Sequence, residues 1–298
     1  MQEFKDKNCF LTGAASGIGR SFALALAKER MNLFITDIDM ENLEKVKREI
    51  EKLGVNVYAD KCDVSKIEDF EHIAKEFHSK LGDIDLLINN AGIAIGGDIL
   101  ELDLKDWKKV IDVNLWSVIY SLKVFLPRML ERGLGHLVNV ASGAGIFGSS
   151  EPLSYISSKF AVIGLSEALF GQLHSRGINV SVIIPSYIKT NIFSSAKIKY
   201  SKRILNAVGK EKLDKIYQSL LDEMASKAIP PDRAVSKYIN GIKKNQLYIY
   251  DMKSLLTLLA LKGNPQQYEA FLINYNENNI KITKQHFQKY GINFDDYI

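Results

Sequence analysis

Short apolar runs alternate with longer stretches of helical periodicity along most of the chain. The runs predict strands at residues 8–12, 32–36, 55–59, 84–88, 135–141, 178–184 and 246–250. Strands that alternate with helices predict a parallel sheet with helices on both faces. Gly54 and Gly177 follow two helical stretches, where glycine commonly ends a helix. The pattern therefore predicts an α/β fold with a doubly wound, seven-stranded parallel sheet.

Glycines and polar residues follow five of the predicted strands. They are Gly13, Asp37, Asn89, Ser142 and Pro185. In open parallel sheets, ligands bind outside the carboxyl ends of the strands. We therefore expect these residues to share one site.

A glycine-rich turn joins the first predicted strand to a helix expected at residues 20–30. Gly13 permits a tight turn, Gly17 lets the backbone approach a phosphate, and Gly19 allows the helix to pack closely on the strand. The helix N-terminus, with Ser16 and Ile18 beside the glycines, offers N–H groups and a positive dipole end to phosphates. The turn predicts a dinucleotide site, and the alternative is a tight loop without a ligand.

An acidic residue ends the second predicted strand. Asp37 can accept hydrogen bonds from both hydroxyls of an adenosine ribose and would repel the additional phosphate of NADP. Ser16 is neutral, and no basic residue directly follows Asp37. The sequence therefore favours NAD over NADP. Alternatively, Asp37 caps the helix expected from Met40, a position that Asp39 could equally take.

Tyr155 and Lys159 lie four residues apart in a predicted helix over residues 154–176. This spacing places the phenol and the ammonium on one face. A free tyrosine, with a pKa of about 10, exchanges protons poorly at neutral pH. A neighbouring cation favours the phenolate, so the pair predicts an acid/base site. The alternative is a solvated helix face.

Together these motifs resemble the short-chain dehydrogenase/reductase family, of the compact single-domain kind, over residues 5–250. The resemblance implies a Rossmann fold and hydride transfer between a nicotinamide dinucleotide and an alcohol or carbonyl compound. It implies that Tyr155 exchanges the substrate's proton and that Lys159 lowers the pKa of this tyrosine. Ser142 would polarise the substrate oxygen, and Asn114 would anchor a water path for the proton.

The resemblance also implies which residues bind the cofactor. Ser186 departs from the family pattern, which usually has glycine after Pro185, so the local backbone path stays open. The implied cofactor residues come from the glycine turn, the strand ends, the predicted helix over 154–176 and the segment after the sixth strand: Gly13, Ser16, Gly17, Ile18, Gly19, Asp37, Asp63, Val64, Asn90, Ala91, Gly92, Tyr155, Lys159, Pro185, Ile188 and Thr190.

The resemblance also implies a substrate pocket beside these residues, under a lid formed by about residues 190–225. The expected lining is Ala94, Ser142, Phe147, Tyr155, Tyr187 and Phe193. Apolar residues recur at helical spacing over 213–224, which predicts an amphipathic helix in the lid. An apolar pocket would favour a steroid, retinoid or fatty-acyl-like alcohol or ketone. The alternative is that the apolar lid residues face the lid's own core.

Composition narrows the class of protein further. A net charge of +4 over 298 residues, without a basic run, gives no indication of nucleic-acid binding. The two cysteines fall at predicted buried positions, and the five histidines show no metal-ligand spacing. No secretory signal precedes the first strand, so a cytoplasmic location is expected. No apolar run is expected to approach the ~20 residues of a membrane span.

Residues 251–298 extend past the predicted Rossmann domain, which covers residues 1–250 and includes the lid. Three short helices are expected there, at 252–262, 264–276 and 281–290. The aromatic residues of this extension predict that it packs on the lid, on a partner subunit or on a membrane surface. Peripheral membrane contact could involve Leu255–Leu261. The resemblance to the family also implies a homodimer or homotetramer that forms through the segments 104–132 and 154–176, with Leu165, Leu169, Phe170 and Leu173 as contact positions.

Two other functions stay open. A non-catalytic dinucleotide sensor or scaffold could be built on the same fold, since fold does not fix function. A protein that only binds the dinucleotide would have no chemical reason to keep the complete set of Asn114, Ser142, Tyr155 and Lys159. A sugar-nucleotide epimerase or dehydratase would show a Gly-x-x-Gly-x-x-Gly spacing, which differs from that of Gly13, Gly17 and Gly19.

Overall fold

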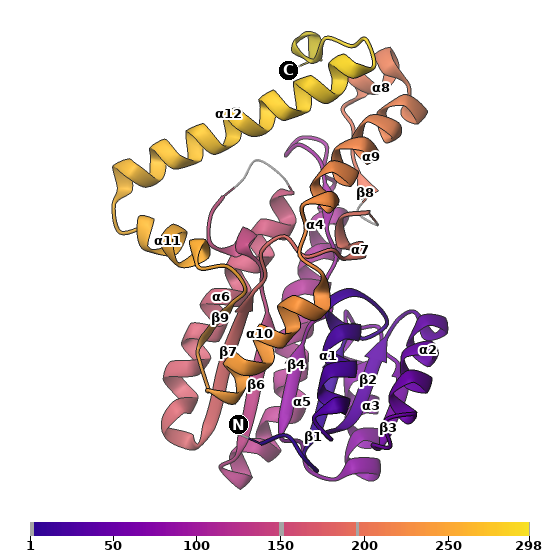
Figure 1. Cartoon of the computed structure of the whole chain (residues 1–298), viewed down its shortest axis with the longest axis vertical. Helices are drawn as coiled ribbons and strands as arrows, with labels where there is room; N and C mark the ends of the chain where they lie inside the picture. The colour runs from indigo at the N-terminus through magenta and orange to yellow at the C-terminus, as the bar shows by residue number, and fades with distance from the viewer. Residues whose placement is uncertain (1–2, 149–151, 195–196, 298) are drawn as a thin grey trace.

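A parallel sheet of seven strands forms the centre of the molecule (Figure 1). The computed structural model describes residues 3–148, 152–194 and 197–297, without the side chains of residues 193 and 194. All neighbouring strands are parallel, which confirms the predicted doubly wound α/β fold. Across the sheet the order is β3 (Val57–Lys61), β2 (Asn32–Asp37), β1 (Asn8–Thr12), β4 (Leu86–Asn89), β6 (Gly135–Val140), β7 (Ile178–Ile184) and β9 (Tyr248–Tyr250).

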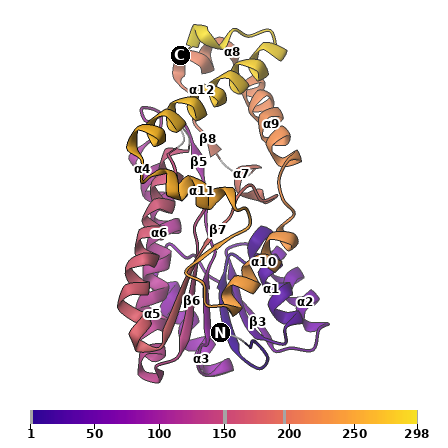
Figure 2. The same cartoon turned by 60° about the vertical axis from the view of Figure 1, so that its left-hand side comes forward.

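Helices cover both faces of this sheet, and a separate apolar core lies under each layer. Side chains alternate between the two cores along a strand, as the period of two requires: Leu11 of β1 enters one and Phe10 the other. One layer consists of α1 (Gly17–Lys28), α2 (Met40–Glu51) and α10 (Pro231–Lys243) (Figures 1 and 2). The other consists of α3 (Ile67–Leu81), α5 (Ser117–Arg132) and α6 (Leu153–Leu173).

The strand predictions are correct to within about two residues at each end. The strand expected at 55–59 is Val57–Lys61, and the one expected at 84–88 is Leu86–Asn89. Register with neighbouring strands sets these ends, since Val57 pairs with Leu33 and Leu86 pairs with Cys9. Pairing across the sheet is information that the local pattern does not contain.

A π turn divides the long helical segment that leads into β6. The segment comprises α4 (Leu104–Ile111), the π-helix η1 (Asp112–Trp116) and α5. By length and composition, Leu104–Arg132 is the one described helix able to span a membrane, so the expectation that none would qualify was wrong. The core helix of a folded domain passes the same test. Here α5 packs on the sheet with Phe125 and Met129 fully buried.

The lid region forms a small unit with its own core. It contains α7 (Asn191–Ser194), β8 (Lys197–Ile198), α8 (Lys202–Val208) and α9 (Lys210–Ser226), and β8 pairs with β5 (Ile95–Gly96). Ile204, Leu213 and Ile216 are buried together with Phe287 from the end of the chain. Many of the apolar lid residues therefore face the core of the lid, as the alternative interpretation held.

The C-terminal extension contains one short and one long helix, which is a correction to the three short helices predicted. The helices are α11 (Ser254–Leu261) and α12 (Pro265–Lys289). Asn264 caps α12 by accepting a hydrogen bond from the backbone of Gln267. The asparagine-rich middle of this segment has low helix propensity but contains no glycine or proline, and packing at both ends keeps the helix continuous.

Candidate active site

The glycine turn has the backbone geometry that its sequence predicted. Gly13 and Gly17 have φ angles of +68° and +53°, which strongly favour glycine. A Cβ atom on Gly19 would lie 1.9 Å from the carbonyl oxygen of Gly13, so only glycine lets α1 approach β1 this closely. Ser16, the residue before α1, makes no side-chain cap hydrogen bond. The amide end of α1 is therefore open to an anion.

Polar groups from β1 and β4 hold this turn in place. The side-chain amide of Asn90 donates to the carbonyl oxygens of Thr12 and Gly13, both at 3.0 Å. The hydroxyl of Thr12 accepts hydrogen bonds from the backbone amides of Asn90 and Ala91. Gly92 comes next and lies beside the Lys159 ammonium. The segment 89–92 thus joins the glycine turn to α6.

Two aspartates after β2 have different roles. Asp39 caps α2, since its carboxylate accepts from the backbone amide of Asn42 at 3.1 Å. Asp37 instead accepts from the backbone amide of Ala15 in the glycine turn at 2.9 Å. The alternative in which Asp37 caps α2 is therefore excluded, and its carboxylate lies beside the open end of α1.

Asp63 and Val64 follow β3 at the same edge of the sheet. The Asp63 carboxylate accepts from the backbone amide and the hydroxyl of Ser65, at 3.1 and 2.6 Å. Val64 is buried. These contacts fix the segment beside the end of β2, where Cys62 donates its backbone amide to the Asp37 carbonyl.

Tyr155, Lys159 and Ser142 come together at the carboxyl end of β6. Tyr155 and Lys159 lie on the inner face of α6 and are only 5% and 3% exposed, which excludes a solvated helix face. The Lys159 ammonium donates to the carbonyl oxygen of Val140 at 2.9 Å and lies 5.5 Å from the centre of the Tyr155 ring. Ser142 accepts from the backbone amide of Ala144 and hydrogen-bonds with Tyr155.

Burial dominates the pKa values of this pair. It raises the pKa of Tyr155 above its ordinary value, and the hydrogen bond with Ser142 only partly opposes this rise. Burial also lowers the pKa of Lys159 from 10.5 to about 8. The net pKa of Tyr155 is therefore raised, whereas the spacing to Lys159 had predicted a lowered value, because desolvation of the phenolate is the largest cause.

Asn114 lies within the π turn, and its side chain is fully used in holding neighbouring segments. Its amide accepts from the backbone amide of Ile93 at 2.9 Å and donates to the Ile93 carbonyl at 3.0 Å. It also donates to the hydroxyl of Ser158, which lies next to Lys159 in α6. π turns occur frequently at functional sites because they free backbone groups from the regular helix ladder.

The segment after β7 completes the edge of the sheet. Thr190 lies against the glycine turn, where a Cβ on Gly17 would be 3.0 Å from its methyl group. Ser186 donates its backbone amide and its hydroxyl to Asp251, at 3.0 and 2.5 Å. Pro185 accepts from the backbone amide of Gly143 at 2.8 Å. Ser186 stands where the family usually has glycine, and the buried Asp251 carboxylate, which follows β9, accepts its hydrogen bonds.

The expected substrate-pocket residues lie on several sides of this edge. Ala94 is buried, and Tyr187 is 37% exposed with its hydroxyl 3.4 Å from the sulfur of Met224 in α9. Phe147 contacts two rings of α12. The side chain of Phe193 lies outside the described part of the chain.

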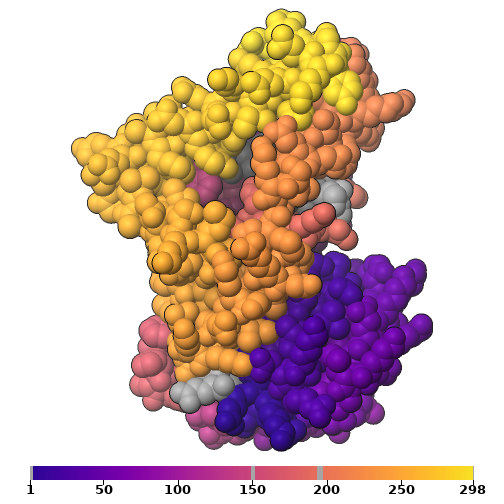
Figure 3. Space-filling view, in the orientation of Figure 1, coloured from indigo at the N-terminus to yellow at the C-terminus, as the bar shows by residue number. Residues whose placement is uncertain are grey.

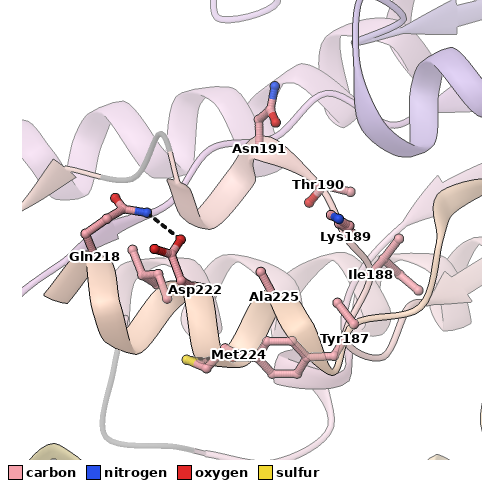
Figure 4. Close-up of a pocket in the computed structure, with 11 residues that line it drawn as sticks. Tyr187, Ile188, Lys189, Thr190, Asn191, Gln218, Asp222, Met224 and Ala225 are labelled. Carbon is pink, nitrogen blue, oxygen red and sulfur yellow. Dashed lines mark hydrogen bonds between the residues drawn. The ribbon is translucent and has the colours of Figure 1, made fainter. Parts of the chain in front are cut away.

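A cavity of about 170 Å³ lies between α9 and the segment after β7 (Figure 4). Its lining includes Tyr187, Ile188 and Thr190 on one side and Leu221 and Met224 on the other. It therefore reaches the residues expected beside the nicotinamide. Tyr155 and Ser142 do not line this cavity.

Sequence reasoning missed several residues that support this edge. Ser158 and Asp251 act through hydrogen bonds, and Phe271 and Tyr275 of α12 contact Phe147. The only signal for the aromatic pair was the aromatic content of the extension. Among the described residues, no group of three or more His, Cys, Asp or Glu side chains is placed to hold a metal ion.

A doubly wound sheet with an open glycine turn and a buried Tyr–Lys pair defines a dinucleotide-binding α/β oxidoreductase. The family model for short chain dehydrogenases matches residues 7–201. Epidermal retinol dehydrogenase 2 of Mus musculus is 32% identical over 257 residues, which cover 85% of this chain and 76% of that protein. Cyclohexanol dehydrogenase of Acinetobacter sp. is 37% identical over 195 residues, or 64% of this chain and 77% of that protein. The chain belongs to the short-chain dehydrogenase/reductase family.

Solved structures share the architecture. A short-chain dehydrogenase/reductase from Burkholderia phymatum in complex with NAD has a TM-score of 0.80 and 27% identity, and the match covers 90% of this chain and 97% of that one. Solved neighbours hold NAD or NADPH, so the fold is compatible with both dinucleotides.

Proposed function

We propose that this protein interconverts an alcohol and a carbonyl compound with NAD(H), and that Tyr155 is its acid/base. The observation that carries this proposal is the burial of the Tyr155 phenol and the Lys159 ammonium at the edge that also holds the glycine turn, with the Ser142 hydroxyl hydrogen-bonded to the phenol. Burying a cation and a phenol side by side costs free energy. A protein that only bound a dinucleotide would gain nothing from that cost.

Each of these groups has a defined task in the proposed reaction. A bound nicotinamide dinucleotide supplies or accepts the hydride. The Tyr155 hydroxyl donates its proton to the carbonyl oxygen during reduction and accepts the alcohol proton during oxidation. The Ser142 hydroxyl lies beside the phenol and orients the same substrate oxygen. Lys159 would hold the nicotinamide ribose of a bound dinucleotide, and Asn114 holds the segment at Ile93 and α6 in a fixed relation.

Changing Tyr155 tests the proposal directly. Tyr155→Phe removes the proton donor, so we expect turnover to fall about 10²–10⁴-fold, while the dissociation constant for NAD changes less than about twofold. Tyr238→Phe is the matched control, because the Tyr238 hydroxyl is buried without a hydrogen-bond partner among the described residues. Stopped-flow or steady-state NADH absorbance gives the rates, and calorimetry gives NAD binding. Full activity in Tyr155→Phe would refute the role of this residue.

The alternative, a non-catalytic dinucleotide sensor or scaffold, predicts a different result. The wild-type protein would then bind NAD and oxidise no alcohol and reduce no ketone.

We further propose that the cofactor is NAD and that the substrate is hydrophobic. The Asp37 carboxylate beside the glycine turn supports NAD, because it would repel the additional phosphate of NADP. The aromatic side chains of Phe147 and Tyr187, and relatives named for retinol and cyclohexanol, support a hydrophobic alcohol. Faster oxidation of sugars and short polyols than of sterols and long-chain alcohols would contradict the substrate class.

A further inference from the structure

The C-terminal helix α12 is held at both ends by different parts of the molecule. Near its start, the rings of Phe271 and Tyr275 pack edge-on against Phe147, with centroid distances of 5.5 and 4.9 Å. Phe147 lies five residues after Ser142, in the segment that follows β6. The first half of α12 is therefore fixed to the segment that carries a candidate catalytic group.

The other end of α12 is fixed to the lid. Phe287 is fully buried against Leu213 and Ile216 of α9. His286 is also buried, and its Nε2 atom lies 3.0 Å from the carboxylate of Glu223. The helix thus bridges the lid and the sheet domain, as Figures 1 and 2 both show.

Between these two ends the inner face of α12 is only half-buried. Leu272, Tyr275 and Ile282 recur at helical spacing and keep part of their surface exposed, unlike Phe287. The opposite face, with Ile273 and Ile280, is 52% and 41% exposed. Figure 3 shows the molecule hollowed beneath α12, between α11 and α9. In the described part of the chain, the inner face of the helix therefore borders this hollow.

Residues of the extension lie close to the candidate catalytic groups. Tyr187 is the common neighbour: burial first, and then the nearby phenols of Tyr275 and Tyr155, raise its pKa to about 12. Leu255 of α11 contacts the position of Gly143, next to Ser142. Residues of the extension and of the catalytic edge thus surround one region.

We propose that α12 is the outer wall of the substrate pocket, with Phe271 and Tyr275 as residues that select for a large apolar group on the alcohol. This inference deepens the proposed function and rests on it. Two aromatic rings next to Phe147 provide a broad apolar surface. A small alcohol that reaches Tyr155 would leave this surface uncovered, whereas a long or cyclic alcohol would bury it and gain binding free energy.

The test compares alcohols of increasing apolar size in variants of the full chain. The wall variant is Phe271→Ala with Tyr275→Ala, and the control is Ile273→Ala with Ile280→Ala on the exposed face of the same helix. The measured quantity is kcat/KM for octan-2-ol divided by kcat/KM for propan-2-ol, with NAD saturating. We expect this ratio to fall at least about 10-fold in the wall variant and to stay at the wild-type value in the control.

A second pair of substitutions covers a folding failure. Phe271→Leu with Tyr275→Leu keeps apolar side chains and good helix formers, so it should fold and give an intermediate ratio. A ratio within about twofold of wild type in the wall variant, or in the leucine variant if the first does not fold, overturns the proposal.

Binding measured without turnover distinguishes this proposal from the proposed function. Octan-2-ol and propan-2-ol are titrated by calorimetry into the protein–NADH complex of each variant. If the wall variant binds octan-2-ol more weakly than the wild type does, and the wild type oxidises no alcohol, the role of α12 in binding is supported and the proposed reaction is wrong. If all variants oxidise alcohols with the same size preference, the proposed role of α12 is wrong and the proposed reaction is supported. Absence of both binding and oxidation overturns both.

Discussion

Lys159 shows most clearly how a single residue can act against stability in this protein. Its ammonium is buried, with the carbonyl oxygen of Val140 as its hydrogen-bond acceptor. Burial lowers the pKa of Lys159 to about 8, whereas the unfolded chain binds the same proton up to about 10.5. Folding at neutral pH therefore includes the cost of holding a cation in an apolar place, which is typical of functional residues.

Replacing this lysine should stabilise the protein. We expect Lys159→Met to raise the free energy of unfolding by about 1–3 kcal/mol at pH 7. The wild-type penalty is fully present below pH 8 and disappears between about pH 8 and 10.5, because only the unfolded chain holds the proton there. Urea denaturation across pH measures the difference, with Lys123→Met on the exposed side of α5 as the control. A gain independent of pH would show that burial of the charge is not the cause.

Asp37 and Asp39 form a natural pair for testing cofactor choice. Asp37→Ala should lower the ratio of kcat/KM for NAD to that for NADP by about 10- to 100-fold, since the variant loses hydrogen bonds to the ribose and the repulsion of the 2′-phosphate. Asp39→Ala should instead cost about 1 kcal/mol of stability through loss of the helix cap, without changing this ratio. Equal ratios in both variants would remove Asp37 from the cofactor site.

At the scale of elements, the glycine turn and α1 are determined by contacts that leave no room for a side chain. Gly19 lies against the carbonyl oxygen of Gly13. This carbonyl follows β1 and accepts a hydrogen bond from the Asn90 side chain, so it cannot move away to make room for a Cβ atom. The sequence predicted this packing because the motif describes a local geometry. The π turn before α5 was not predicted, because helical periodicity does not distinguish a π turn within a long apolar segment.

Two glycine-to-alanine substitutions should have opposite effects. Gly19→Ala should lower the free energy of unfolding by about 1–3 kcal/mol and weaken NAD binding about 10-fold or more, because a Cβ there meets backbone. Gly164→Ala in α6 meets nothing within 4 Å and should stabilise the helix by about 0.5–1 kcal/mol. Thermal unfolding and NAD calorimetry measure both. Unchanged NAD binding in Gly19→Ala would contradict the assignment of this turn to the phosphates.

At the scale of the whole molecule, the expected subunit contact needs revision. Leu169 and Leu173, two of the residues expected in that contact, are buried in the core of the monomer. Leu165 and Phe170 remain half-buried. Trp116, the last residue of η1 before α5, is 43% exposed and stacks on Tyr120 with the ring centres 5.8 Å apart. An exposed tryptophan stacked on a half-buried tyrosine is typical of interface cores.

We propose that the protein forms a homodimer or homotetramer through α5 and α6, with Trp116 in the contact. Light scattering should give at least twice the monomer mass of 33.5 kDa, and Trp116→Glu should lower it by placing a charge in an apolar contact. Leu134→Glu, at another exposed apolar residue outside these helices, is the control. A wild-type monomer at micromolar concentration would contradict the proposal.

Much of the fold and part of the candidate site could be read from short stretches of sequence. Strands, the glycine turn and the Tyr155–Lys159 spacing are local patterns, because backbone period and glycine conformation act over a few residues. The resemblance to a family then placed Ser142 and Asn114 beside them, and the structure puts these groups at one edge of the sheet.

Tertiary structure alone decided the rest. The direction of the Tyr155 pKa depends on how much water the surrounding segments exclude, which the spacing to Lys159 does not determine. The continuity of α12 and its contact with Phe147 arise from packing between segments far apart in the chain. Local sequence fixes backbone preferences, whereas burial and long-range contacts depend on the assembly of the whole chain, so these properties followed only from the three-dimensional structure.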